Sequence, residues 1–204
     1  FHDLVKEFAS GGKQHGRLAF THLWLDGLRG HALLDYWRAY YLEMTERFAA
    51  ANPKQRVQWF GPDMSVRSSI TARLMETWAH SQAIYDVLGK TRSDTDRIKN
   101  VVVIGMNTFG WTFKNREIAV PTDIPSLRLT APSGEIWEWN QPNQGHYIEG
   151  NAVEFCQVVT QVRNIADTTL RVVGEAATAW MSIAQCFAGP PQDPPAPGSR
   201  FRQG

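Results

Sequence analysis

Glu76 and His80 are four positions apart in a stretch with no glycine or proline, "RLMETWAHSQ" at residues 73 to 82. Side chains at this spacing share one face of a helix, with about 6 Å between their β-carbons. A neutral imidazole and a carboxylate both bind zinc at about 2.0 to 2.2 Å, and a catalytic zinc keeps one of its four positions open. The alternative is a surface hydrogen bond or weak ion pair, which the same spacing also allows.

The other histidines do not identify a third metal ligand. His15, His22 and His31 lie in the polar early part of the chain, and each has the chemistry to serve, but no spacing selects one of them. His146 follows the turn sequence "PNQG", where a solvated side chain is expected. The residues by themselves therefore offer two candidate ligands and no third, and they do not decide between a metal site and a surface ion pair.

The two cysteines do not form a motif for nucleophilic or redox chemistry. Cys156 and Cys186 are thirty positions apart without a CxxC spacing. Two cysteines in a chain of 204 residues do not make a disulfide framework either. We predict that both are buried free thiols in helical core segments.

The Glu76 and His80 pair requires a helix to position it, and the flanking residues predict one from about 65 to 89. Ser65 can cap its first turn, and Gly89 is a common stop residue. Apolar residues at spacings of three and four predict an earlier helix over 31 to 51, and "SDTD" at 93 to 96 predicts the start of a further one.

The pattern changes after Pro121. "PSLRLTAPSGEIWEWN" predicts a hairpin, followed by a strand at 147 to 149, a helix capped near Asn151, a strand in "TTLRVVGE" and a closing helix. The expected fold class is α+β. We expect a helical part at 1–118, an α+β part at 119–190, and a disordered proline-rich tail at 191–204.

Composition indicates an ordinary globular protein. Apolar residues make up 43% of the chain and charged residues 20%, with 21 basic and 20 acidic side chains. This balance gives no basic surface for nucleic acid, and no apolar run approaches the roughly 20 residues of a membrane span. We expect a soluble cytoplasmic protein, either a monomer or a homodimer, whose partners are small molecules.

Several segments resemble the DinB-like metal-binding family grouped with mycothiol-dependent maleylpyruvate isomerases. The longest is "VQWFGPDMSVRSSITARLMETWAHSQAIYDVLG" at 57 to 89, in which "GPxMSxxxxxTARLMETWAH" is far more specific than a short pattern. "LTAPSGEIWEW", "VTQVRNIADTTLRVVG" and "WMSIAQCFAGPP" continue the likeness in the C-terminal part.

The resemblance implies a DinB-like four-helix bundle followed by a small α+β domain similar to sterol-carrier folds. It implies that Glu76 and His80 bind a divalent metal, usually zinc, together with a histidine of an early helix. That helix is expected before Phe1, so the N-terminal part of the bundle is expected to be missing. Ala83 stands where relatives often carry an aspartate, and Val162 precedes Arg163 where they often show paired basic residues.

Four further residues are candidates for the site. Arg163 and Arg73 could bind carboxylates of a thiol or substrate, because a guanidinium contacts a carboxylate through two nitrogens. The alternatives are solvation for Arg163 and a salt bridge to Glu76 or Asp63 for Arg73. Trp59 and Trp78 are candidate pocket residues, with core packing as the alternative.

Three functions are compatible with these residues. The resemblance favours a zinc-dependent isomerase or S-transferase that acts on a small electrophile with a low-molecular-weight thiol such as mycothiol. The second is a metal-binding protein without turnover, and the third is a carrier of a small ligand. Neither the thiol nor the electrophile can be identified from the residues.

Overall fold

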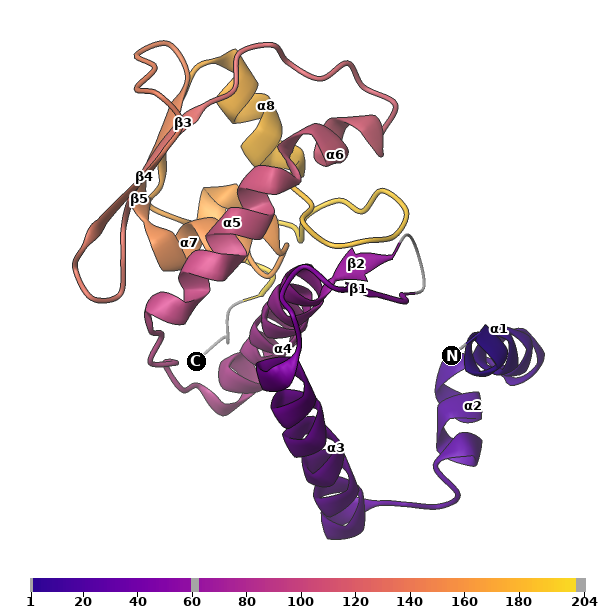
Figure 1. Cartoon of the computed structure of the whole chain (residues 1–204). Coiled ribbons are helices and arrows are strands. Elements are labelled where there is room, and N and C mark those ends of the chain that lie inside the picture. Colours follow the sequence, from indigo (N-terminus) through magenta and orange to yellow (C-terminus); the bar gives the residue numbers. More distant parts are fainter. Residues whose placement is uncertain (1, 60–62, 201–204) are drawn as a thin grey trace. The chain divides into compact units, whose positions relative to one another are not determined.

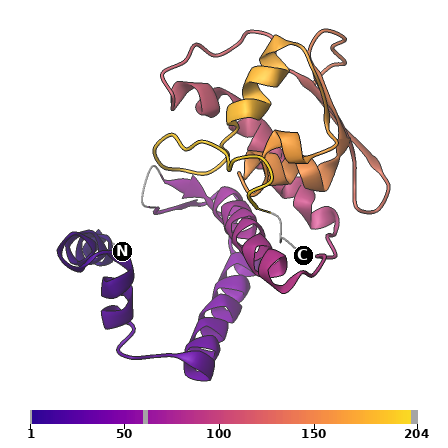
Figure 2. The ribbon, with the colours of Figure 1, turned by 180° about the vertical axis from the view of Figure 1, so that it is seen from behind.

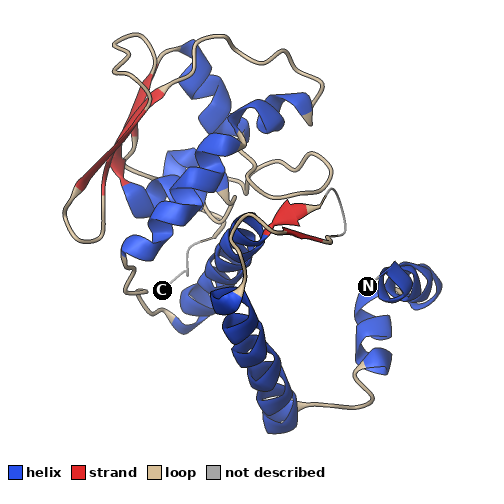
Figure 3. Cartoon of the chain, viewed as in Figure 1, coloured by secondary structure: helices blue, strands red, loops and turns tan. Residues whose placement is uncertain are grey.

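The computed structural model describes residues 2–59 and 63–200, and its contacts divide the chain into two compact units. Unit 1 is Phe1–Ile70 and unit 2 is Thr71–Gly204. Figure 1 traces the elements in chain order, and Figure 3 separates helices from strands. The boundary expected between 118 and 119 lies inside unit 2, because helices before residue 118 share a hydrophobic core with the sheet that follows them.

In its described residues, unit 1 contains three whole helices, the first turn of a fourth and a two-stranded sheet. The helices are α1 (His2–His15), α2 (Arg17–Trp24) and α3 (Gly30–Ala50). Phe8 of α1 packs edge-on against Phe20 and Trp24 of α2, with ring centroids 5.3 and 5.1 Å away. The predicted helix over 31 to 51 is confirmed as α3, but none of its residues is buried.

A short hairpin precedes the helix that carries the candidate metal ligands. Strand β1 (Arg56–Val57) pairs antiparallel with β2 (Met64–Ser65) in the connection between the helices predicted over 31 to 51 and 65 to 89. Residues 60–62 of that connection lie outside the described residues. Helix α4 follows at Val66–Leu88, in agreement with the predicted start near Ser65 and stop at Gly89. Its first turn belongs to unit 1 and the rest to unit 2.

Unit 2 is built on a four-stranded sheet with strand order β4-β3-β5-β6. Strands β3 (Ser126–Thr130) and β4 (Ile136–Trp139) form the predicted hairpin, with Leu127 opposite Trp139. Strand β5 (Tyr147–Asn151) runs parallel to β3, and β6 (Arg171–Val173) pairs antiparallel with β5. Together with the helices of both units, this sheet makes the fold α+β, as predicted.

Helices cover one face of this sheet, as Figures 1 and 2 show from opposite sides. They include α5 (Lys99–Asn107), α7 (Ala152–Val159) and α8 (Glu175–Ile183), while the short α6 (Phe109–Lys114) packs against α8. The described residues of this unit also form two 3-10 turns, η1 (Asp96–Ile98) and η2 (Ile165–Asp167). Helix α7 begins as predicted, because the side chain of Asn151 accepts a hydrogen bond from the Val153 amide.

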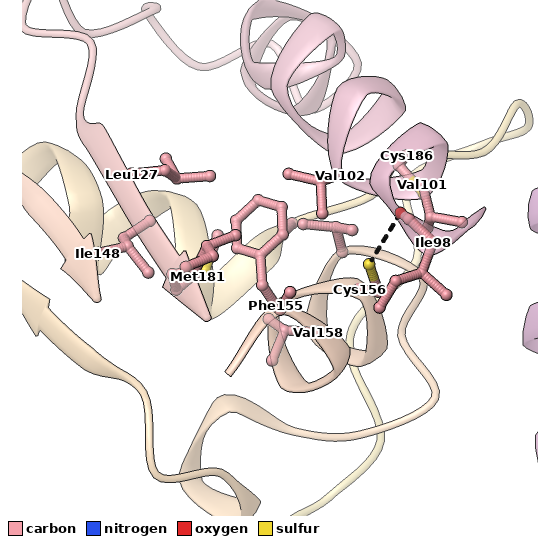
Figure 4. Packing of buried hydrophobic residues seen from close by; sticks show 14 of the residues in the cluster. Ile98, Val101, Val102, Leu127, Ile148, Phe155, Cys156, Val158, Met181 and Cys186 are labelled. Carbon is pink, nitrogen blue, oxygen red and sulfur yellow. Dashed lines mark hydrogen bonds between the residues drawn. The ribbon is translucent and has the colours of Figure 1, made fainter. Parts of the chain in front are cut away.

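The core of unit 2 lies between the sheet and these helices (Figure 4). Leu127 and Leu129 alternate with exposed Arg128 along β3, so one face of the strand enters the core. Fully buried residues from the helices meet them there, including Val101, Val102, Phe155, Val158 and Met181.

The expectation of a disordered tail is wrong for residues 191–200, which follow a defined path over unit 2. The side chain of Gln161 donates a hydrogen bond to the carbonyl of Gln192 (2.7 Å), and that of Asn164 donates to Pro195 (2.8 Å). The Gly198 amide donates to the Asp167 carboxylate (2.8 Å). The proline-rich composition gave no sign of these contacts, because a segment without large apolar side chains can still be held through its backbone groups. Residues 201–204 lie outside the described residues.

Candidate functional site

Glu76 and His80 lie side by side on α4, as their spacing predicts. The Oε2 atom of Glu76 is 3.1 Å from Nε2 of His80. The side chain of His80 is 84% exposed and that of Glu76 is 42% exposed. The two donor atoms therefore converge on one point at the protein surface, where water or a small molecule can reach them.

This separation is compatible with a shared zinc ion. Two ligand atoms in a tetrahedral zinc site, each about 2.0 to 2.2 Å from the ion, are about 3.4 Å apart. The observed pair needs to open by a few tenths of an ångström, which rotation of two exposed side chains permits. The same distance also suits a direct hydrogen bond, so the pair supplies two zinc ligands and does not by itself define a site.

A third ligand is not placed beside this pair within the described part of the chain, where no group of three or more His, Cys, Asp or Glu residues could hold a metal ion. His15 and His22 lie on α1 and α2 of unit 1, where both line a cavity of about 500 Å³. His31 is an exposed residue in the first turn of α3.

A neighbouring face of α4 packs into the core of unit 2 and fixes the helix that carries the candidate ligands. Met75, Trp78 and Ala79 are buried in the core of that unit. The Trp78 indole donates a hydrogen bond to Asp94 (2.7 Å), and the Arg92 guanidinium lies 4.1 Å from the centre of its ring. Trp78 is therefore a core residue whose indole N–H is already bonded to Asp94. This contact does not support its predicted place in a ligand pocket.

Arg92 extends this anchor to the α4 backbone. Its Nη1 donates to the carbonyl oxygen of Trp78 (2.7 Å), and its Nε donates to Asp94 (3.0 Å). The side chains of Arg92 and Asp94 are only 9% and 10% exposed. The sequence "TRSDTD" predicts the start of a helix, but nothing in it shows that Arg92 and Asp94 are buried against α4.

Arg163 is neither solvated nor available as an open fork for a ligand. It is 6% exposed, and its Nη2 and Nη1 donate to Oδ1 and Oδ2 of Asp86 at 2.6 and 2.9 Å. Both expectations for this residue are therefore corrected. The reason is a partner on α4 that is far away in sequence, because a buried guanidinium requires a carboxylate or other acceptors.

Asp86 is a second functional candidate that the sequence reasoning missed. Burial by itself favours its protonated form, but hydrogen bonds from Arg163 and Gln82 and the charge of Arg163 outweigh that effect, so the pKa of Asp86 is lowered. The spacing of the residues could have identified Asp86. Gln82 and Asp86 follow buried Met75 and Ala79 at intervals of three and four, so two polar side chains lie on the face of α4 that packs into the core.

The remaining candidates are placed as follows. Arg73 is an exposed residue of α4, three positions before Glu76 and in unit 2. Trp59 is half-buried and follows β1 in unit 1. Among the six predicted site residues, Glu76 and His80 are brought into contact with each other, whereas Arg163 pairs with Asp86 and Trp78 joins the core.

Both cysteines are buried free thiols, as predicted. Burial raises the pKa of Cys156 well above its ordinary value, and its Sγ lies 3.6 Å from the Ile98 carbonyl oxygen (Figure 4). Burial, with the Glu76 carboxylate as a smaller contribution, also raises the pKa of Cys186. Cys186 follows the end of α8 rather than lying within a helix. Neither sulfur is a ready nucleophile.

Among the helices of the described residues, none combines the length and the apolar character that a membrane-spanning helix needs.

Comparison with known proteins supports the relation that the motifs indicate. Residues 13–85 match the family of mycothiol maleylpyruvate isomerase N-terminal domains. The matched range includes Glu76 and His80, whereas Asp86 and Arg163 fall outside it. The resemblance predicted from the sequence is therefore confirmed over this range.

Two uncharacterised proteins of Mycobacterium tuberculosis, one from each of two strains, are 38% identical to the chain over 159 residues. The similarity covers 78% of this chain and 62% of each relative, so the chain spans about three-fifths of their length. No solved structure matches the chain.

Proposed function

We propose, from the premise that residues 13–85 belong to the family of mycothiol maleylpyruvate isomerase N-terminal domains, that the protein binds a divalent metal, zinc by preference, at Glu76 and His80. The activity proposed for it is that of an isomerase or S-transferase, which uses a low-molecular-weight thiol such as mycothiol on a small electrophile. The observation that carries the proposal is the 3.1 Å approach of the two donor atoms inside the matched range.

Each residue has a defined part in this proposal. His80 would donate the lone pair of Nε2, which requires its neutral imidazole, and Glu76 would supply one negative charge and an oxygen. When bound, the ion would stabilise a thiolate at neutral pH and polarise an electrophilic carbonyl group. The protein's own thiols are buried and protonated, so the reacting thiol would come from solution.

The thiol would add to the carbon–carbon double bond of the electrophile: one carbon–sulfur bond would form as the π bond breaks, and the proton of the thiol would pass to the electrophile. An isomerase would break the carbon–sulfur bond again after rotation about the former double bond and release the thiol unchanged, whereas a transferase would release the thioether as product. The proposal also includes the finer fold that the resemblance implies: a DinB-like four-helix arrangement for the helical part, and a sterol-carrier-like α+β domain.

The first test measures metal content. We expect the full-length protein, expressed with zinc and dialysed, to retain about one ion per chain. Glu76→Ala and His80→Ala should each lose most of it, because each removes a protein ligand. Thr77→Ala is the matched control, since Thr77 is an exposed residue of the same helix between the two ligands. Unchanged metal content in both ligand variants would remove the basis of the proposal.

A metal-binding protein without turnover is the second candidate. The observation in its favour is the 84% exposure of His80, because catalytic groups usually act in sites that exclude water. The zinc-loaded protein should be assayed for mycothiol-dependent isomerisation of maleylpyruvate and for loss of thiol with other electrophiles. Stoichiometric zinc without either activity would favour this second candidate.

A further inference from the structure

We propose that Arg163 is a positioning residue: its buried ion pair with Asp86 clamps the C-terminal half of α4 to the α+β part of unit 2, and thereby holds Glu76 and His80 in place. The clamp itself is a structural inference, and its effect on metal binding rests on the proposed function. Neither partner of the pair lies in the range matched by the family model.

Arg163 and Asp86 form a bidentate ion pair. Arg163 contacts both oxygens of Asp86 through separate nitrogens, at 2.6 and 2.9 Å, and the two residues are 77 positions apart in the chain. Their side chains are 7% and 19% exposed. Gln82, one turn earlier on α4, donates a further hydrogen bond to Oδ1 of Asp86 (2.9 Å). Two parallel charge-assisted bonds fix orientation as well as distance.

The clamp works with the second anchor on the same helix. Trp78, held by Asp94 and Arg92, lies two residues before His80, and Asp86 lies six residues after it. A helix rises about 1.5 Å per residue, so the two anchors are about 12 Å apart along α4 and the ligand histidine lies between them. With both ends of this segment fixed, rotation or bending of the helix at His80 is opposed.

The same contacts indicate that Arg163 acts by positioning α4 and does not itself bind a substrate or thiol carboxylate. Its two terminal nitrogens are both used by Asp86, and Nη1 also donates to the carbonyl of Val162 (2.8 Å). A carboxylate ligand would have to displace Asp86 and leave that charge buried without its partner, which is costly.

The test measures the clamp and the metal separately in the full-length protein. Arg163→Lys keeps the charge but loses the two-pronged contact, and Asp86→Asn keeps the size but loses the charge. Arg171→Lys is the matched control, because Arg171 forms an exposed ion pair with Glu149 (3.6 Å) in the same unit. The first readout is amide hydrogen exchange of residues 79–88 without metal, with the amides of α5 as an internal reference for global unfolding.

We expect Arg163→Lys and Asp86→Asn to speed exchange in residues 79–88 about ten-fold relative to α5, and Arg171→Lys to leave it unchanged. The second readout is zinc affinity, measured by competition with a chelator, which should fall about ten-fold or more in the two clamp variants, as for residues that orient metal ligands. The exchanged pair, Arg163→Asp with Asp86→Arg, should recover part of both effects.

Each contrary result has a distinct meaning. Unchanged exchange at residues 79–88 in both clamp variants would overturn the clamp. Faster exchange with unchanged zinc affinity would overturn the positioning role and leave the proposed function standing. If the parent protein bound no zinc, the proposed function and the metal part of this inference would fail together, and the exchange data would still decide on the clamp.

Discussion

The sulfur atoms of Cys156 and Cys186 illustrate how burial controls a single residue's chemistry. Cys156 is 0% exposed and Cys186 is 5% exposed, and burial raises the pKa of both thiols. The thiolate is the reactive form, and an apolar surrounding disfavours it. The proposed thiol chemistry therefore relies on a thiol from solution, which could reach the exposed Glu76 and His80 pair while the protein's own cysteines stay buried.

We predict that neither cysteine reacts with a disulfide reagent in the native protein at pH 8, whereas both react within seconds in denaturant. The measurement is absorbance of the released thiolate, and Cys156→Ser and Cys186→Ser should each remove one equivalent in denaturant. The raised pKa values of the two thiols also link stability to pH. Below the unfolded-state thiol pKa of about 8.5, both states are protonated and the folded state keeps its full stability; as pH rises above this value, the thiols of the unfolded state ionise first and the stability falls. Fast native labelling would contradict the buried, protonated assignment.

At the scale of elements, the junction between β6 and α8 depends on a glycine. Gly174 has φ +91°, and an added β-carbon there would overlap the carbonyl oxygen of Gly145 and approach the ring of His146. The next helix starts directly after it, so the close approach ties the loop at 145 to 146 to the start of α8. Both the backbone conformation and the space exclude a side chain.

We predict that Gly174→Ala destabilises the protein by at least about 2 kcal/mol more than Gly134→Ala, through steric overlap. Gly134 is the matched control because it has nearly the same φ, +90°, but no atom within 4 Å of the added β-carbon. Its substitution should cost only the strain of the left-handed conformation, about 1 to 2 kcal/mol. Urea unfolding gives both free energies, and equal costs would show that the loop moves away without penalty.

At the scale of the whole molecule, the two units differ in how much they bury. Unit 2 contains a continuous core with residues such as Val101, Val102 and Phe155 at 0% exposure, whereas the 21 residues of α3 in unit 1 include none that is buried. Most helical stability in proteins comes from packing of an apolar face, so α3 depends more on its local propensity than α5 or α7.

We predict that α3 exchanges its amide hydrogens at least about a hundred-fold faster than α5 and α7 in the intact protein, because buried helices open only in larger unfolding events. Hydrogen exchange with mass spectrometry at residues 30–50, 99–107 and 152–159 gives the comparison within one sample. Equal protection would show that α3 buries a face in solution, through another part of the protein or a second copy.

Local sequence signals were sufficient to predict several helices and strands, and to predict that Glu76 and His80 lie close together. Helix α4, the hairpin of β3 and β4, and the cap at Asn151 depend on residues within a few positions of one another, so capping and periodicity predict them. The Glu76 and His80 contact belongs to the same class, because helix geometry alone brings residues four apart together.

Only the tertiary structure shows which residues pair with the buried charges. Arg163 meets Asp86 across 77 positions, and Arg92 reaches the α4 backbone at Trp78 across 14. A long charged side chain is equally plausible in solvent or in a buried pair, and the choice depends on packing that brings distant segments together. For this reason Arg163, expected to bind a ligand, instead pairs with Asp86. For the same reason the proline-rich tail, expected to be disordered, is held against unit 2 through the backbone carbonyl groups of Gln192 and Pro195.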